Sequence, residues 1–431
     1  METVACPDCD LLQRLPELPP GGKARCPRCG QALATKPTDP LGRALALTLT
    51  AAIVFIVANT APLMGLSAVG RHASTTIVGG AYQMWVQGQE VTAVIVAFCA
   101  VIAPGSYILF MLTILLAVRR PPAPQWIGEM LRWKDAMQPW SMNEVMILGI
   151  LVALIKIAEL ARVDPGVGMY AVGGLVALFP AIMVTFDPRE VWKRIEWADG
   201  QAPPPPEARG ATPRRGRAMT ATALTAAQAG LVSCETCALL SQPADAAEPG
   251  YCPRCGGELA LRRHHSIQYT WALVIAAAIC FIPANVLPVL TTNALGSSDS
   301  DTIIGGVVFL YTSGSWPLAL IVLVASVMVP LGKLIALSYL LITVQRGSLG
   351  SRRERTRLYR MLTLVGRWSM LDVFVDTFIV ALVQLQPLMS VEPGPGVVFF
   401  AAVVVLTMIA AESFDPRLVW DSRANREERH V

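Results

Sequence analysis

The stretch Ala58-Asn59-Thr60-Ala61-Pro62 decides the fold, because it returns 226 residues later as Ala284-Asn285-Val286-Leu287-Pro288. At the same offset, Thr76-Ile77-Val78-Gly79-Gly80 returns as Thr302-Ile303-Ile304-Gly305-Gly306. The second half of the chain therefore repeats the first. Two repeats that form one pseudo-symmetric body are common among membrane transport proteins and uncommon among soluble enzymes.

The composition places both repeats in a lipid bilayer. Of the 431 residues, 54% are hydrophobic and only 15% are charged, whereas soluble domains carry about 25% charged residues. Each half contains four apolar runs long enough to cross a hydrocarbon core of ~30 Å. These runs cover residues 43–66, 91–118, 141–161, 167–186, 268–292, 316–342, 369–390 and 395–413. The predicted fold class is an all-α polytopic membrane protein with two tandem four-helix transmembrane modules.

The lysines and arginines predict the orientation of these spans. Of 35 such residues, 30 lie in the two terminal segments and in every second connecting segment, whereas only Arg71 and Arg162 lie in the other four. By the positive-inside rule, both termini and the long central segment are expected to be cytoplasmic. Because the basic residues follow the topology, the net charge of +4 gives no reason to expect a nucleic-acid partner.

Two sets of four cysteines precede the two apolar blocks, and both have the spacing of four-thiolate zinc ribbons. The sets are Cys6, Cys9, Cys26 and Cys29, and Cys234, Cys237, Cys252 and Cys255. Gly30 and Gly256 follow the second pair of each set and permit a tight turn there. Four thiolates leave no open coordination position, so two structural zinc ions are expected. The alternative, disulfide pairing, is disfavoured in a reducing cytoplasm.

The ribbons and apolar blocks define a linear order of domains. The predicted boundaries are zinc ribbon 1 at 1–40, transmembrane module 1 at 41–200, a flexible linker at 201–230, zinc ribbon 2 at 231–262, and transmembrane module 2 at 263–431. Residues 203–206 are four prolines in a stretch poor in large apolar residues, which is typical of a solvated linker. The segments on the outer side are short, so if the protein moves something across a periplasm, another protein must supply the passage.

Lys333 is the strongest candidate for a working residue, because it lies near the middle of the sixth predicted span. A charge at that depth costs about 2.5 to 3.5 kcal/mol on insertion scales and persists only when it is paired, hydrated or used. Ser326 lies two helical turns earlier, and Pro330 frees the carbonyl of Ser326, so these groups are expected to converge on Lys333.

The next two spans supply possible partners for this lysine. Asp372 and Asp376 lie one turn apart on the seventh span, and Thr407 adds a hydroxyl from the eighth. The first repeat has Tyr107 where the second has Lys333, which favours a transport network in the second module. The alternative is a buried salt bridge that only fixes helix packing. The sequence contains no phosphate-binding loop and no G-x-S-x-G motif, so an enzyme is not expected.

Taken together, the repeated motifs resemble the paraquat-inducible protein A family, the inner-membrane partners of MCE-domain lipid transport proteins in Gram-negative bacteria. The resemblance covers nearly the whole chain and rests on the two ribbons and three duplicated motifs. The motifs are Asn59 to Pro62 and Asn285 to Pro288, Trp140 to Val145 and Trp368 to Val373, and Phe186 to Arg189 and Phe414 to Arg417.

The resemblance implies a multi-pass protein of the cell inner membrane that loads or unloads phospholipid for a periplasmic MCE tunnel protein. In the leading hypothesis, Lys333 with Asp372 or Asp376 changes protonation during the transport cycle. A competing hypothesis is a passive scaffold that anchors the tunnel protein and uses its buried charges for stability. A membrane redox enzyme is disfavoured, because the cysteines fit closed zinc sites.

Overall fold

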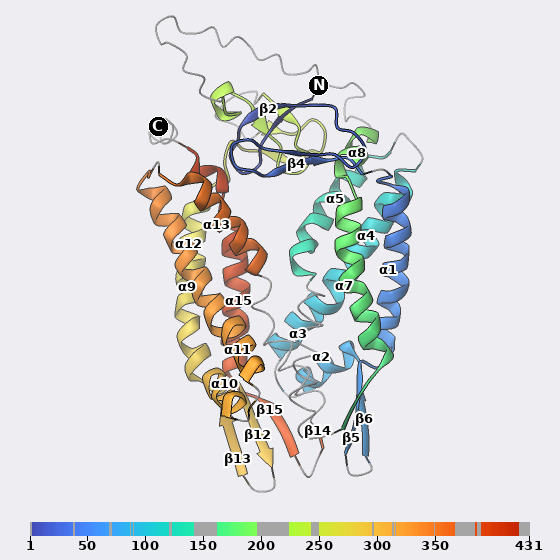
Figure 1. The fold of residues 1–431 in the computed structure, drawn as a ribbon, viewed down its shortest axis with the longest axis vertical. Helices are drawn as coiled ribbons and strands as arrows, with labels where there is room; N and C mark the ends of the chain where they lie inside the picture. Colours follow the sequence, from blue (N-terminus) through green and yellow to red (C-terminus); the bar gives the residue numbers. More distant parts are fainter. Residues whose placement is uncertain are drawn as a thin grey trace, which may run out of the picture.

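The chain forms two helical bundles that lie side by side, with small β-structures at both ends (Figure 1). We call the end that holds both cysteine-rich segments the ribbon end, and the opposite end the sheet end. The computed structural model describes residues 2–37, 39–68, 71–86, 88, 90–119, 123–141, 162–195, 224–242, 250–294, 297–312, 314, 316–348, 350–366, 384–385 and 389–421.

Within the described residues, six helical segments are long and apolar enough to cross a membrane. They are α1 (Gly42–Thr60), α3 (Glu90–Ala97) continued by η1 (Phe98–Ile102) and α4 (Ala103–Ala117), α7 (Val167–Thr185), α9 (Ser266–Val286), α11 (Trp316–Leu323) continued by η4 (Val324–Met328) and α12 (Val329–Gln345), and α15 (Gly396–Ser413). Apart from Ser141, the predicted span 141–161 lies outside the described residues.

The two bundles are built in the same way, as the sequence repeat predicts. Helix α1 packs along α7 in the first module, and α9 packs along α15 in the second. Helices α1 and α9 both end before the proline of the Asn-x-x-Pro motif, and Ala61 and Leu287 are extended there. Proline favours this outcome, because the residue before it is pushed out of the helical region.

Close backbone contacts fix the sheet-end corner of each module. The amide of Gly166 donates to the carbonyl of Leu63, and that of Gly394 donates to Val289. A Cβ atom at either glycine would collide with the backbone carbonyl of Pro62 or Pro288. Glycine is required here because only it lets the two backbones approach this closely.

Each long broken span contains a π-helical turn directly before its proline. Segments η1 and η4 occupy equivalent places in the two repeats, one turn ahead of Pro104 and Pro330. The amide after each segment donates five residues back, to Phe98 or Val324. A π turn inserts one extra residue, and this rotates all later side chains relative to the earlier ones.

The sheet end carries β-structure that the predicted all-α class did not include. Among the described residues, three strands form one antiparallel sheet in the first module, and four form another in the second. They are β5 (Met64–Ala68), β6 (Arg71–Thr75) and β7 (Arg162–Pro165), then β12 (Leu290–Ala294), β13 (Ser297–Asp301), β14 (Gln384–Leu385) and β15 (Met389–Pro393). Two predicted spans, 43–66 and 268–292, therefore run too far, because their last residues form strands β5 and β12. Of the predicted span 369–390, only residues 384–385 and 389–390 are described, and they belong to β14 and β15; the rest lies outside the described residues.

Short helices connect these elements. On the sheet side they are α2 (Ile77–Val86) and α10 (Ile303–Thr312). On the ribbon side they are α5 (Trp126–Met137), η2 (Gln138–Trp140), α8 (Pro188–Arg194), α13 (Arg352–Val365) and η6 (Pro416–Val419). Helix α13 packs against α12 and α15, and Leu362 on it belongs to the core of the second module.

The ribbon end consists of four two-stranded hairpins, two in each cysteine-rich segment. The first segment contains β1 (Glu2–Ala5), β2 (Leu12–Leu15), β3 (Lys23–Arg25) and β4 (Ala32–Thr35). The second contains η3 (Ala227–Ala229), β8 (Val232–Ser233), β9 (Leu240–Ser241), β10 (Gly250–Tyr251) and β11 (Glu258–Leu259). Each hairpin turns at one pair of cysteines, so the two pairs of a segment meet.

Candidate functional site

The cysteines of each ribbon form a cluster suited to one metal ion. The Sγ atoms of Cys6 and Cys29 lie 3.4 Å apart, and those of Cys9 and Cys26 lie 3.5 Å apart. The second ribbon repeats these distances, and all ligand atoms of a cluster lie within 4.8 Å of one another. Tetrahedral zinc with Zn–S bonds of ~2.3 Å places its sulfurs about 3.8 Å apart.

The same distances argue against the disulfide alternative. A disulfide needs sulfurs at ~2.05 Å, and all ten cysteines are free thiols. The donor set therefore fits a four-thiolate metal ion, with Cys6, Cys9, Cys26 and Cys29 as ligands in one ribbon and Cys234, Cys237, Cys252 and Cys255 in the other.

The residue after each cysteine pair adopts the left-handed conformation. Gly30 and Gly256 have φ values of 78° and 64°, as their sequence positions predict. Asp10 and Ala238 hold the equivalent places with φ values of 59° and 56°, although a side chain makes this conformation costly. The knuckle geometry therefore dictates the backbone at all four places, whichever residue is present.

Each ribbon uses its second knuckle to contact the module of the other repeat. The guanidinium of Arg28 in ribbon 1 stacks 4.5 Å from the ring of Trp420, which follows η6 in module 2. The guanidinium of Arg254 in ribbon 2 lies 5.9 Å from the ring of Trp192, in α8 of module 1. These four residues are equivalent in pairs, so the crossed docking follows the internal symmetry.

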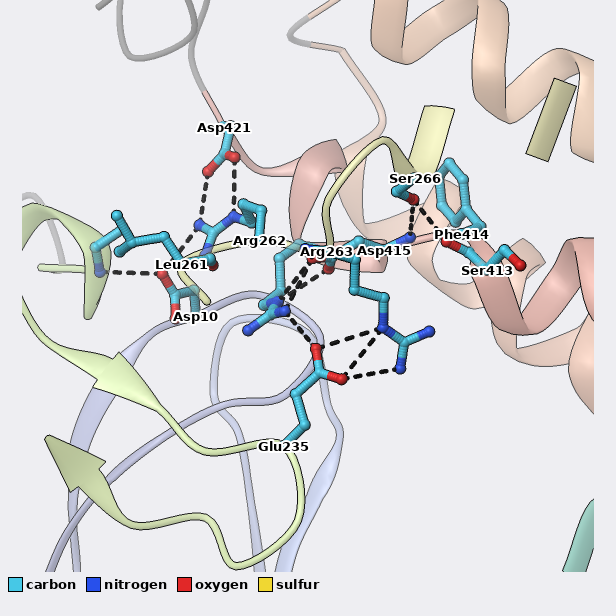
Figure 2. Close-up of polar contacts among 12 residues, drawn as sticks. Asp10, Glu235, Leu261, Arg262, Arg263, Ser266, Ser413, Phe414, Asp415 and Asp421 are labelled. Carbon is cyan, nitrogen blue, oxygen red and sulfur yellow. Dashed lines mark hydrogen bonds and ion pairs between the residues drawn. The ribbon is translucent and has the colours of Figure 1, made fainter. Parts of the chain in front are cut away.

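A group of charges, all buried except the half-exposed Glu235, joins the two ribbons to the start and end of module 2 (Figure 2). Arg262 donates to Asp10 of ribbon 1 at 3.0 Å and to Asp421 at 2.8 Å. Arg417 pairs with Asp415 at 2.9 Å and with Glu235 of ribbon 2 at 2.7 Å. These contacts fasten segments that lie far apart in the sequence.

Asp415 is the most buried acid of this group, with 1% of its side chain exposed. Burial opposes its ionisation, but hydrogen bonds and the charge of Arg417 outweigh burial and hold the pKa of Asp415 below its usual range. Asp187 caps α8 at the equivalent place in module 1, where burial dominates and raises its pKa.

A pocket of about 210 Å³ lies between α12, α13 and α15 of module 2. It extends from Glu412, at the ribbon end of α15, to Lys333 near the start of α12, mid-way along the broken span. Lys333 is 4% exposed, and its Nζ donates to Thr407 Oγ1 at 3.3 Å. The lining residues are Lys333, Leu337, Leu362, Thr363, Gly366, Thr407, Met408, Ala411 and Glu412.

The structure brings together two of the five residues predicted for the transport network. Lys333 and Thr407 are hydrogen-bonded, but Ser326 does not line the pocket, and its hydroxyl donates to the carbonyl of Val322 in its own helix. Ser326 lies within the π turn η4, so a spacing of seven residues no longer places it on the same helix face as Lys333. Asp372 and Asp376 lie outside the described residues.

Sequence reasoning missed the helix that closes the pocket. Leu362 and Thr363 on α13 and Gly366 directly after it line the pocket, in a stretch where the sequence predicts only a connecting segment. The signal was present, because Arg355, Thr356, Tyr359 and Leu362 follow the spacing of one helix face, and Arg355, Thr356 and Leu362 are buried. Gly366 was also overlooked, although a Cβ there would lie 3.4 Å from Cε of Lys333.

These features define a multi-pass membrane protein with two four-cysteine clusters at one end and a buried lysine in the second of two repeats. The chain belongs to the Paraquat-inducible protein A family, which matches residues 41–196 and 267–424, once in each repeat.

Curated relatives align along almost the entire chain. Intermembrane transport protein PqiA of Escherichia coli is 32% identical, with 98% of this chain and 97% of the relative aligned. Lipophilic envelope-spanning tunnel protein A of the same organism is 31% identical, over 98% and 92%. A probable intermembrane transport protein of Haemophilus influenzae is 28% identical, over 96% and 95%. No solved structure matches the chain.

Proposed function

We propose that this chain is the inner-membrane subunit of a system that transports phospholipid between membranes, with both termini in the cytoplasm. In this proposal the chain loads or unloads lipid for a periplasmic MCE-domain tunnel protein. Relatives named for intermembrane transport support it. So does the short sheet end, whose described strands are at most five residues long, because a passage across a periplasm then has to come from a partner.

The pocket around Lys333 is the observation that carries the proposal. It joins a cation held inside a transmembrane helix to an apolar wall that includes Leu337, Leu362 and Met408. A phospholipid offers the matching chemistry, since its anionic phosphate pairs with an ammonium group and its chains fit apolar surface. Lys333 with Asp372 and Asp376 is also suited to carrying protons, because intramembrane ionisable groups mark such relays.

In the same proposal, one structural zinc ion occupies each ribbon. The metal supplies folding energy and no chemistry, because four thiolates close its coordination shell. Each ribbon spans only about 30 residues and cannot bury a sufficient core of its own. Zinc therefore lets the ribbons hold the two modules together at their cytoplasmic ends.

A combined substitution separates the transport role from the scaffold role. Lys333→Met with Asp372→Asn and Asp376→Asn removes both signs of charge, so no buried charge is left alone and folding should be close to normal. We expect membrane abundance near that of the parent and loss of the envelope barrier in cells, measured as growth on detergent. Tyr107→Phe, at the equivalent place in module 1, is the matched control and should grow normally.

Normal growth of the combined variant on detergent would contradict the transport role of these charges and favour the scaffold hypothesis. Lipid transfer is then measured directly, with the chain reconstituted beside its tunnel partner, in the presence and absence of a proton gradient. Transfer that is faster with the gradient in the parent, but not in the combined variant, supports the proton-coupled network.

A further inference from the structure

Ribbon 1 binds helix α13 of the other repeat through Arg360. The Nε atom of Arg360 donates to Asp8 Oδ2 at 2.7 Å, and Nη1 donates to the carbonyl of Cys29 at 3.1 Å. Its Nη2 atom lies 3.3 Å from Cys29 Sγ, one of the four thiols of the cluster. One guanidinium therefore contacts the metal-ligand sulfur, its backbone and a neighbouring acid at the same time.

A second contact between ribbon 1 and α13 runs through Trp420. The indole Nε1 donates to Thr356 Oγ1 on α13 at 2.9 Å, and Arg28 of ribbon 1 covers the indole ring. Thr356 and Arg360 are four residues apart, so they lie on one face of the helix. Ribbon 1 thus fixes the rotation of α13 at two successive turns.

The same helix forms one wall of the Lys333 pocket. Thr363 continues the face of Thr356 and Arg360 one turn further on, ~4.5 Å along the axis, and it lines the pocket. Gly366 follows beside Lys333, with only van der Waals space for a Cβ. A small rotation of α13 would therefore change the walls of the pocket and the space around the lysine ammonium.

Tyr359 joins α13 to its own module independently of the ribbon. The hydroxyl of Tyr359 donates to the carbonyl of Ala411 at 3.1 Å, and its ring packs against Phe414 at the end of α15. These contacts add to the packing of Leu362 in the core of module 2 and hold α13 against α12 and α15. The two ribbon contacts act in addition to this packing and set the rotation of the helix.

We propose that Arg360 is a positioning residue that couples the metal centre of ribbon 1 to the pocket around Lys333. When the four thiolates of ribbon 1 hold a metal, the Cys29 knuckle keeps Arg360 and α13 in the orientation that closes the pocket. When the metal leaves, the knuckle loses its fixed geometry and α13 is released. The inference rests on the proposed metal occupancy and is independent of what the pocket binds.

Module 1 offers a matched control for this coupling. Arg132 on α5 occupies the place equivalent to Arg360 and reaches ribbon 2. Its Nη1 lies 4.0 Å from the position that a Cβ atom would take if Gly257 carried a side chain. Arg132 forms an ion pair with Glu129 of its own helix. In the first repeat, Tyr107 stands at the position of Lys333 and stacks on Phe179.

Pulsed alkylation with mass spectrometry tests the proposal on the purified full chain. The background carries Cys99→Ala and Cys280→Ala, and Met408→Cys places a reporter thiol on the pocket wall opposite α13. In the zinc-loaded parent this thiol should react slowly, because Met408 is 7% exposed. Met361→Cys reports on the exposed side of α13, where the rate should not depend on the pocket.

Arg360→Met should accelerate alkylation of the reporter at position 408 and of the four cysteines of ribbon 1 by about tenfold, the effect of losing a charged hydrogen bond. Arg132→Met should change neither. Cys26→Ser, which empties ribbon 1, should accelerate the reporter equally, whereas Cys252→Ser in ribbon 2 should not. Arg360→Lys keeps the charge but not the planar fork, so it should fall between parent and Arg360→Met.

An unchanged reporter rate in Arg360→Met and Cys26→Ser would overturn the coupling, even if ribbon 1 loses its metal. If Arg360→Met does not fold, a rate in Arg360→Lys equal to that of the parent overturns the coupling by itself. Metal analysis of the parent separates the two proposals. A parent protein that contains no zinc would contradict the proposed metal occupancy. A zinc-loaded parent whose alkylation rate at position 408 is unaffected by the substitutions would contradict only the coupling.

Discussion

Asp187 and Asp415 hold the same place in the two repeats. Ionisation of the Asp415 carboxyl is expected to stabilise the fold, whereas ionisation of the Asp187 carboxyl is expected to destabilise it. Both cap the short helix after the last span, and each accepts the amide of the arginine two residues on. The pKa of Asp415 is lowered and that of Asp187 is raised. An acid with a lowered pKa stabilises the fold above its unfolded pKa and loses this contribution as pH falls through its folded pKa.

Asp415→Asn should therefore destabilise the chain at pH 7 by about 3 kcal/mol, since it leaves Arg417 and Arg262 with less compensating charge. Thermal unfolding followed by tryptophan fluorescence measures this. The difference from the parent should persist down to about pH 4, the unfolded pKa of an aspartate, and shrink below it. Asp187→Asn is the control and should cost clearly less at pH 7. Equal losses at both sites would contradict the assignment.

The ribbons are the elements on which this architecture depends most strongly. Their hairpins are short, and the cysteine side chains themselves make up most of the buried cluster in ribbon 1. Without metal, nothing of comparable strength holds the two knuckles of a ribbon together. Metal loss is thus expected to act on abundance and folding before it acts on any specific activity.

Metal analysis of the purified chain should give two zinc ions. Cys26→Ser should reduce this to one and lower the amount of protein in the membrane, because three thiolates bind zinc more weakly and the ribbon loses its folding energy. Cys280→Ser, which changes a thiol in α9 outside both clusters, should keep two ions. A metal content near zero, or disulfides between knuckles in fresh protein, would exclude structural zinc.

The elements were predictable from the sequence where a single local pattern sets them. Apolar runs predicted the helices, and cysteine spacing predicted both clusters. The sheet strands were not predictable in this way, because residues such as Met64 to Ala68 continue an apolar run and only pairing with β7, about 100 residues away, makes them strands. Likewise, no local signal places Arg360 beside Cys29, 331 residues earlier.

The candidate site shows the same limit at finer scale. Lys333 and Thr407, which share the pocket and a hydrogen bond, stand out in the sequence because a lysine in hydrocarbon is costly and Thr407 lies mid-way along its helix. The expectation that Ser326 and Lys333 share one helix face assumes an uninterrupted α-helix, whereas the structure has a π turn before Pro330. The pocket wall from α13 depends on tertiary packing, which spacing alone does not specify.

At the scale of the whole molecule, the ribbon end is basic and the sheet end is not, which predicts the topology. The test uses a variant of the chain in which Cys99 and Cys280 are replaced by alanine. Thiols introduced into it by Ser74→Cys or Ser298→Cys, in the sheet-end strands β6 and β13, should react with a membrane-impermeant reagent in intact spheroplasts. A thiol introduced by Ser348→Cys, at the ribbon end, should react only after lysis. Labelling of the thiol at position 348 in intact spheroplasts would contradict the predicted orientation.

The crossed docking of the ribbons also bears on how such a chain arises. A protein of one repeat alone would present the arginine of its second knuckle and the tryptophan after its last span to different neighbours. Two copies would satisfy both contacts only by exchanging ribbons, which is the geometry of a domain-swapped, two-fold symmetric dimer. Joining the copies in one chain makes that exchange intramolecular, and it lets the two halves differ, with Tyr107 in one at the place where the other has Lys333.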